Sequence, residues 1–244
     1  MPSRPFQKPP TQVEAVLLEL RRALLEGDYP AGTRLNVDGI SKTLGVSRAP
    51  VRDALRILEG EQQVIYEPHR GYCVPEMRLD DLFDLYRIRE LLESEAAALA
   101  VPLLTPADIA TLRASAEVVS RALAEGNRVA ATYANRELHF RLFESPGHEQ
   151  LVTSIRQAWN ADAYRALYLR DLESAAASAR EHDAIVDAAA EGDVSRVILL
   201  QNAHRDGELR ALLRMLTDRF PDAEDVATKR WRATTGVEAF AETA

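Results

Sequence analysis

Two short amphipathic helices separated by a glycine, within residues 40–57, are the feature that most constrains how this chain can fold. That stretch reads ISKTLGVSRAPVRDALRI. Its apolar residues are spaced so that each helix buries one face, and they are Ile40, Leu44, Val46, Val51, Leu55 and, just beyond it, Leu58. Gly45 stands where a tight turn needs a residue that tolerates positive φ, and Ser47 stands at the N-cap of the second helix. The pattern predicts a helix-turn-helix.

The second helix carries a row of arginines, Arg48, Arg52 and Arg56, spaced four apart and therefore on one face. By itself such a row is more often a solvated face than a binding site. Here it is followed by two β-prone segments, 64–66 and 72–74, that flank the basic turn EPHRG. A helix-turn-helix followed by a basic hairpin is a winged helix-turn-helix, which places its second helix in the major groove of DNA.

The charge distribution restricts any nucleic-acid contact to the N-terminal third of the chain. The 244 residues have a net charge of −8, which argues against non-specific coating of nucleic acid. Residues 1–78 hold 11 Lys and Arg against 10 Asp and Glu, whereas the remainder holds 19 against 28. There is one cysteine, no apolar run long enough to span a membrane and no apolar signal-peptide core at the N-terminus. We therefore expect a soluble, cytoplasmic protein.

From Leu79 onward the apolar pattern is helical, with almost no strand signal. Short connections rich in Gly, Pro and Asp imply an antiparallel bundle of about six helices. The predicted helices are 79–101, 105–125, 128–143, 149–169, 173–191 and 194–216. The expected fold is thus mainly α, with a disordered lead-in at 1–10, a winged helix-turn-helix at 11–78, an all-helical domain at 79–218 and a tail at 219–244.

Histidines distributed over the bundle are its candidate chemistry. Asn135 and His139 are four apart and share a helical face, while His182 and His204 lie on two further predicted helices. Three imidazoles and an amide oxygen would suit a divalent transition metal. Each histidine taken alone is better interpreted as a surface or hydrogen-bonded core residue, and the residues by themselves favour that interpretation over a metal site. His148, in a turn, is assigned no metal.

The N-terminal part resembles the winged helix-turn-helix of GntR-family bacterial transcription regulators. The segments that carry the resemblance are LLEGDYPAGTRL, LGVSRAPVRDALRILE and PHRGYCV. The resemblance implies that the operator is approached by Arg34, Ser47, Arg48, Arg52 and the wing-tip residues His69, Arg70 and Gly71. The family usually has Gly-Leu before the first wing strand, where this chain has Gln62 and Gln63. A glutamine at positive φ would be strained, so we expect a different helix end or wing geometry.

The C-terminal part resembles the FCD effector domain of the FadR/VanR branch, through LYRIRELLE, NRELHFRLF and EHDAIVDAA. That resemblance implies a metal held by Asn135, His139, His182 and His204, with zinc expected and nickel or manganese as alternatives. Aspartate is the commoner first ligand, so Asn135 removes a negative charge from the site. The resemblance also implies a small carboxylate effector. Arg89 is the candidate contact for it, and the alternative for Arg89 is a surface ion pair with Glu93, four residues on.

Together these resemblances imply a homodimeric repressor that binds a palindromic operator in double-stranded DNA and is released by its effector. The alternative function is a metal-dependent enzyme acting on a small organic acid, because three histidines can leave coordination positions open. The sequence contains neither H-E-x-x-H nor a nucleophile elbow, which favours the regulator.

Overall fold

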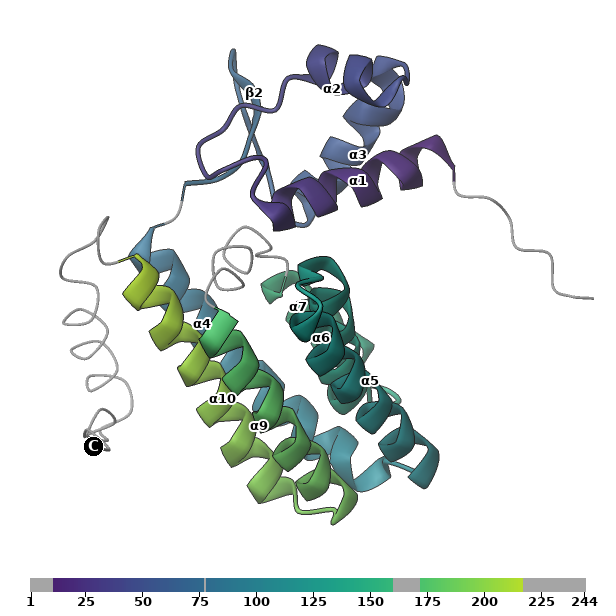
Figure 1. Ribbon diagram of the computed structural model, residues 1–244, viewed down its shortest axis with the longest axis vertical. Helices are drawn as coiled ribbons and strands as arrows, with labels where there is room; N and C mark the ends of the chain where they lie inside the picture. Colours follow the sequence, from purple (N-terminus) through teal and green to yellow (C-terminus); the bar gives the residue numbers. More distant parts are fainter. Residues whose placement is uncertain (1–10, 77, 160–171, 217–244) are drawn as a thin grey trace, which may run out of the picture. The chain divides into compact units, whose positions relative to one another are not determined.

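The computed structural model describes residues 11–76, 78–159 and 172–216 (Figure 1). The chain forms two compact units, divided between residues 76 and 77. The predicted lead-in at 1–10 and the predicted tail at 219–244 lie outside the described residues.

The first unit consists of three helices and a hairpin. Its helices are α1 (Gln12–Glu26), α2 (Val37–Leu44) and α3 (Arg48–Gly60), followed by strands β1 (Ile65–Glu67) and β2 (Gly71–Cys73). The strands pair antiparallel with Tyr66 opposite Tyr72, and Arg34 forms an isolated bridge with Cys73. One apolar core joins α1, α3 and the hairpin, and its fully buried members include Val51, Leu55, Leu58 and Val64. This is the predicted winged helix-turn-helix.

Local signals in the sequence determine where these helices begin and end. Thr11 and Glu14 form a capping box at the start of α1, in which each side chain accepts a hydrogen bond from the other residue's backbone N–H. Gly45 ends α2 with φ 66°, the left-handed conformation expected for the turn. Ser47 is the N-cap of α3, as predicted, but its side chain makes no capping hydrogen bond.

The connection from α3 to the wing keeps a left-handed residue although no glycine is present there. Gln62 adopts φ 61°, which costs a residue with a Cβ on the order of 1–2 kcal/mol. Gln63 is 5% exposed, and its Oε1 has no hydrogen-bond partner within the described ranges. The hairpin forms all the same, with strain at Gln62 and a buried amide at Gln63 after the end of α3.

The second unit is a helical bundle, in agreement with the prediction. Its elements are α4 (Leu79–Ala100), the 3₁₀ turn η1 (Val101–Leu103), α5 (Pro106–Ala124), α6 (Arg128–Phe143), α7 (Glu149–Ala158), α9 (Leu172–Ala190) and α10 (Val194–Met215). Helix α10 packs against α9 and α4, and α5 packs against α6 and α9 (Figure 1). The predicted helix 149–169 was too long, because α7 ends at Ala158 with Trp159 as its C-cap. Residues 160–171 lie outside the described residues.

The main core of the bundle is aliphatic and aromatic, and fully buried members include Leu138, Leu142, Phe143, Ile155 and Ile185. These residues come from α6, α7 and α9, so the helices are fixed in their rotation about their own axes by apolar packing. The polar residues that face inward are therefore held in defined positions. Among the helices of the described ranges, none is long and apolar enough to cross a membrane.

Candidate functional site

A hollow of about 570 Å³ in the first unit is lined by arginines. Arg34 lies before α2, Arg52 and Arg56 lie on α3, and Arg70 lies at the tip of the hairpin. All four are exposed. The two segments that the sequence predicted to approach DNA, the second helix and the wing, therefore border one cationic surface.

The arginines of this surface differ in their acidic neighbours. Arg48 Nε lies 2.7 Å from Asp38, and Arg70 Nη1 lies 2.6 Å from Glu67. In contrast, Arg34 and Arg52 have no acidic group within 4.0 Å in the part of the chain that the structure describes. Exposed charges without an internal partner are the ones that interact with phosphate at the lowest cost. Arg34 and Arg52 are therefore the better-placed cations of the predicted set.

The remaining residues predicted to approach DNA lie at the start of α3 and around the wing turn. Ser47 is exposed at the N-terminus of α3. His69 has φ 65° and Gly71 has φ 84°, so both ends of the wing turn are in the left-handed conformation, which only Gly71 adopts without strain. His69 is exposed and stands in the turn between β1 and β2.

In the second unit, three buried histidines converge from three helices. His139 lies on α6, His182 on α9 and His204 on α10, and their exposed fractions are 2%, 0% and 3%. One nitrogen from each ring lies within 4.8 Å of the other two. Neutral imidazoles so placed are an ordinary donor set for a divalent transition metal. The fold thus brings together the three histidines of the predicted set, and these three residues could bind a metal ion.

The other polar atoms around the cluster support this fit. Asn135 is 2% exposed and lies one turn before His139 on α6, while Gln201 is 3% exposed and precedes His204 on α10. Asn135 Nδ2, Gln201 Nε2 and His204 Nε2 have no hydrogen-bond partner among the described residues. Buried polar atoms are normally satisfied, so a group of unsatisfied ones indicates a ligand or water site.

The tautomer of His204 follows from its neighbour. His204 Nδ1 lies 2.8 Å from Oε2 of Glu181, which is half-exposed on α9. An ionised carboxylate can only accept a hydrogen bond, so Nδ1–H of His204 donates this one, and Nε2 is the ring nitrogen left to face a metal. A carboxylate in this position is also what orients the histidine ligands of many metal sites.

A buried network of charges extends from the histidines toward α4. Glu93 is 2% exposed and accepts hydrogen bonds from Arg89 Nε at 2.7 Å, Arg205 Nη2 at 2.9 Å and Trp159 Nε1 at 2.7 Å. Arg89 also stacks over the Trp159 ring at 4.4 Å from its centroid. Since Arg89 is only 7% exposed, the alternative of a surface ion pair with Glu93 was wrong: the pair exists, but it is buried.

Burial and charge act in opposite directions on Glu93. Burial by itself raises the pKa of its carboxyl, but the attraction of Arg89 and Arg205, together with hydrogen bonds from Arg89 and Trp159, holds that pKa below its usual value. Glu93 is therefore ionised. A fourth charged residue, Glu208, is 4% exposed, with Oε2 3.8 Å from Arg89 Nη1 and Oε1 3.7 Å from His204 Nε2. The network thus contains two arginines and two glutamates.

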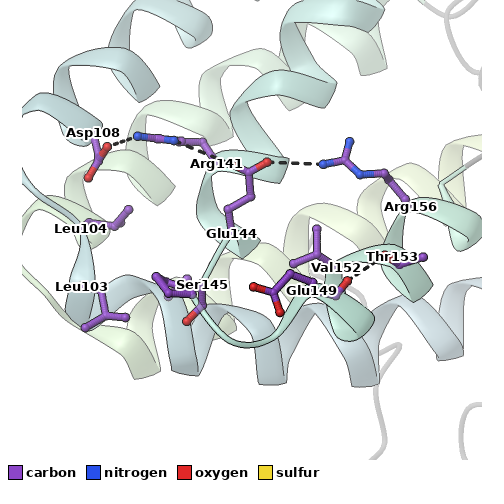
Figure 2. A pocket seen from close by; sticks show the side chains of 12 residues that line it. Leu103, Leu104, Asp108, Arg141, Glu144, Ser145, Glu149, Val152, Thr153 and Arg156 are labelled. Atoms are coloured by element: carbon purple, nitrogen blue, oxygen red, sulfur yellow. Dashed lines mark hydrogen bonds and ion pairs between the residues drawn. The ribbon is translucent and has the colours of Figure 1, made fainter.

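A second hollow of about 590 Å³ lies elsewhere in the bundle, where η1 and α5 approach the ends of α6 and α7 (Figure 2). Arg141 pairs there with Asp108, and Arg156 lies 3.4 Å from Glu144. Figure 2 shows both guanidinium groups directed at these carboxylates rather than into open space. Because each of these arginines is already paired with a carboxylate, this hollow is a weaker candidate for binding an anion than the region around the three histidines.

Two known protein families match this chain, one over each unit. Residues 12–74 match the family model "Bacterial regulatory proteins, gntR family", and residues 84–207 match the FCD domain. The chain belongs to the GntR family of regulators that carry a C-terminal FCD domain. The predicted family and fold are therefore confirmed, and the GntR model covers the arginine-lined surface while the FCD model covers His139, His182 and His204.

Curated GntR relatives are transcription regulators and not enzymes. The HTH-type transcriptional regulator McbR of Escherichia coli is 32% identical over 141 residues, which are 58% of this chain and 64% of McbR. The Nta operon transcriptional regulator of Aminobacter aminovorans is 31% identical over 52% of this chain and 60% of its own length. The chain thus spans less than two thirds of the length of these relatives. The chain carries the GntR and FCD domains of this family.

Solved GntR structures share the fold. The structure of E. coli McbR/YncC covers 84% of this chain and 99% of its own, with a TM-score of 0.73 and 23% identity. A GntR transcriptional regulator from Rhodococcus sp. RHA1 covers 82% and 97%, with a TM-score of 0.68 and 24% identity.

The sequence did not predict several charged residues that lie near the three histidines. Glu93 entered only as a surface partner for Arg89, and Glu181 was assigned no role. Arg205 and Glu208 were not singled out, although Glu208 follows His204 by four residues and therefore shares its helical face. The spacing of four residues between His204 and Glu208 was the available signal. It does not indicate a role for Glu208, because the sequence does not show what this face of the helix packs against.

Proposed function

We propose that this regulator binds a palindromic operator as a homodimer and that a small carboxylate metabolite, bound beside a metal ion in the FCD domain, controls that binding. The operator contacts in this proposal are made by Arg34, Ser47, Arg48, Arg52 and the wing tip at 69–71. Two recognition helices of a dimer would enter successive major grooves, roughly 34 Å apart. Arg34 and Arg52 support this assignment, because both are exposed and neither has an acidic partner among the described residues.

Asn135, His139, His182 and His204 would hold the metal, and zinc is the ion we propose. The single observation that carries this proposal is the convergence of three buried imidazoles from α6, α9 and α10 within 4.8 Å. When bound, the metal would supply a positive anchor for a carboxylate oxygen of the effector. Arg89 would pair with a second anionic group of the effector, because its guanidinium lies in the same buried network as His204.

Control of DNA binding requires that the effector bind two states of the dimer with different affinity. The network is suited to such a difference because it joins α4 to α10: Glu93 of α4 pairs with Arg205 of α10 at 2.9 Å. Helix α4 is also the first helix after the wing. An effector that redistributes the partners of Arg89 would therefore favour one placement of α4 over another.

Elemental analysis of the purified protein, paired with a thermal-shift screen of small carboxylic acids with and without chelator, tests the proposal. We expect about one metal per chain, because the three imidazoles form a single cluster. An effector that binds the folded state raises Tm by mass action, and it should do so only in the metal-loaded protein. His182→Ala should lose the metal, whereas His148→Ala, outside the cluster, should keep it. Equal metal content in these two variants would contradict the assignment.

A further inference from the structure

Glu181 connects one of the three buried histidines to the surface of the bundle. Its Oε2 lies 2.8 Å from Nδ1 of His204, so the contact joins α9 to α10. The side chain of His204 is 3% exposed, whereas that of Glu181 is 49% exposed. The group of three imidazoles that could hold a metal does not include Glu181. This carboxylate therefore lies behind one of the predicted ligands rather than among them.

The position of Glu181 follows from its place on α9. Glu181 and His182 are consecutive residues of this helix, so their side chains leave it about 100° apart. His182 is fully buried with the other histidines, and Glu181 reaches His204 on α10, which packs against α9. One helix thus supplies a predicted ligand and also the contact that holds the predicted ligand of its neighbour.

This contact decides which nitrogen of His204 is available to a metal. A neutral imidazole carries its proton on either ring nitrogen, and only the other nitrogen has a lone pair for a metal. The hydrogen bond that Glu181 accepts keeps the proton on Nδ1 and restricts the rotation of the ring. Nε2 of His204 is buried and has no hydrogen-bond partner among the described residues. The lone pair is therefore on the nitrogen that is free to bind.

We propose that Glu181 is the positioning residue of the metal site. It holds His204 in the tautomer and the orientation that bind the metal, and it does so from outside the set of ligands. This inference rests on the metal-binding part of the proposed function. It makes the zinc affinity of a buried site depend on an exposed side chain, and it makes metal binding depend on the pairing of α9 with α10.

Zinc affinity of the full-length, chelator-stripped protein tests the inference, measured by competition with a chromophoric chelator. Glu181→Gln should weaken Zn²⁺ binding about tenfold or more, because an amide carries no charge and can offer an N–H to Nδ1. Asp183→Asn is the matched control. Asp183 is the exposed carboxylate on the other side of His182 in the sequence, so this variant removes the same charge from the same helix and should leave the affinity unchanged.

The tautomer of His204 gives a second measurement, which a purely structural role of Glu181 would not change. Long-range ¹H–¹⁵N correlation spectra of the zinc-free protein at neutral pH distinguish the two tautomers, and the signal that is absent from His204→Gln identifies this ring. We expect the proton on Nδ1 in wild type and in Asp183→Asn. In Glu181→Gln it should move at least partly to Nε2, because no carboxylate then holds it on Nδ1.

The outcomes separate the inference from the function on which it rests. If Glu181→Gln binds Zn²⁺ as tightly as wild type, the role of Glu181 is refuted and the histidine site stands. Equal losses in Glu181→Gln and Asp183→Asn would show an effect of charge alone and also refute it, as would an unchanged tautomer. Absence of Zn²⁺ binding by wild type would overturn both proposals. Should circular dichroism show that Glu181→Gln is unfolded, Glu181→Asp decides, because it keeps the charge but shortens the reach: zinc affinity equal to that of wild type would refute positioning.

Discussion

Replacing Glu93 with glutamine tests whether the buried charges act as one balanced network. Glu93→Gln keeps an oxygen that can accept from Trp159 Nε1 but removes the negative charge between Arg89 and Arg205. Two buried arginines would then face one buried glutamate, Glu208. The excess positive charge is poorly solvated, because Arg89 and Arg205 are both buried, with exposed fractions of 7% and 2%.

The expected cost follows from these contacts. Breaking a buried ion pair by removing one partner costs about 3–5 kcal/mol. The lower end applies here, since Glu208 still lies 3.8 Å from Arg89 and Asn202 Oδ1 still accepts from Arg205 Nη1 at 2.9 Å. We therefore expect Glu93→Gln to lower the free energy of unfolding by about 3 kcal/mol. That is a large part of the 5–15 kcal/mol typical of a folded domain.

Removing Arg205 as well should recover most of this loss. In the Glu93→Gln, Arg205→Met double variant, Arg89 and Glu208 remain as one balanced pair, and methionine fills part of the volume of Arg205. Buried pairs replaced by neutral groups of similar shape are often close to neutral in stability. We expect the free energy of unfolding of the double variant to lie within about 1 kcal/mol of the wild-type value. This loss is smaller than the loss caused by Glu93→Gln alone, and smaller than the sum of the losses caused by the two single substitutions.

Urea unfolding followed by far-UV circular dichroism measures these differences, with chelator present so that bound metal does not contribute. Asp187→Asn is the matched control: it breaks the pair with Arg113 at 2.8 Å, in which both side chains are half-exposed, and should change stability by less than about 1 kcal/mol. Additivity of Glu93→Gln and Arg205→Met within about 0.5 kcal/mol would refute a shared network.

Three further predictions concern the DNA surface, the wing connection and a helix cap. Arg52→Ala should weaken binding to a selected palindromic site about tenfold and reduce its salt dependence, whereas Arg22→Ala, on α1 and paired with Glu19, should not; equal affinity at matched salt would contradict the role of Arg52. Gln62→Gly should raise the urea midpoint by relieving the positive φ, with a net gain of roughly 0.5 kcal/mol because glycine also adds entropy to the unfolded chain; a lower midpoint would show that the conformation is not strained. Hydrogen bonds with the backbone and side chain of Thr105 and with Arg141 lower the pKa of Asp108 to about 2, below its unfolded value, so its stabilisation is present above about pH 4 and is lost as the pH falls to 2. The Tm difference between wild type and Asp108→Asn should therefore vanish near pH 2, and a difference of the same size at pH 2 and pH 6 would contradict this reasoning.

The sequence by itself determined those features that depend on neighbours along the chain. Helix periodicity, the Thr11 and Thr105 caps and the turn at Gly45 are readable because their interactions span three or four residues. The row of arginines on α3 and the shared helical face of Asn135 and His139 can be predicted from the sequence for the same reason. The family resemblance added that His182 and His204 belong with them, which spacing alone could not establish.

Only the tertiary structure decided which side chains meet across helices. Glu93 and Arg205 are 112 residues apart, and Glu93 and Trp159 are 66 apart, so no local period in the sequence relates them. The burial of Arg89 and the position of Glu208 beside His204 Nε2 depend on how α4 and α10 are rotated against each other. That rotation is set by the apolar packing of the whole bundle, which is a property of all the helices together and of no single segment.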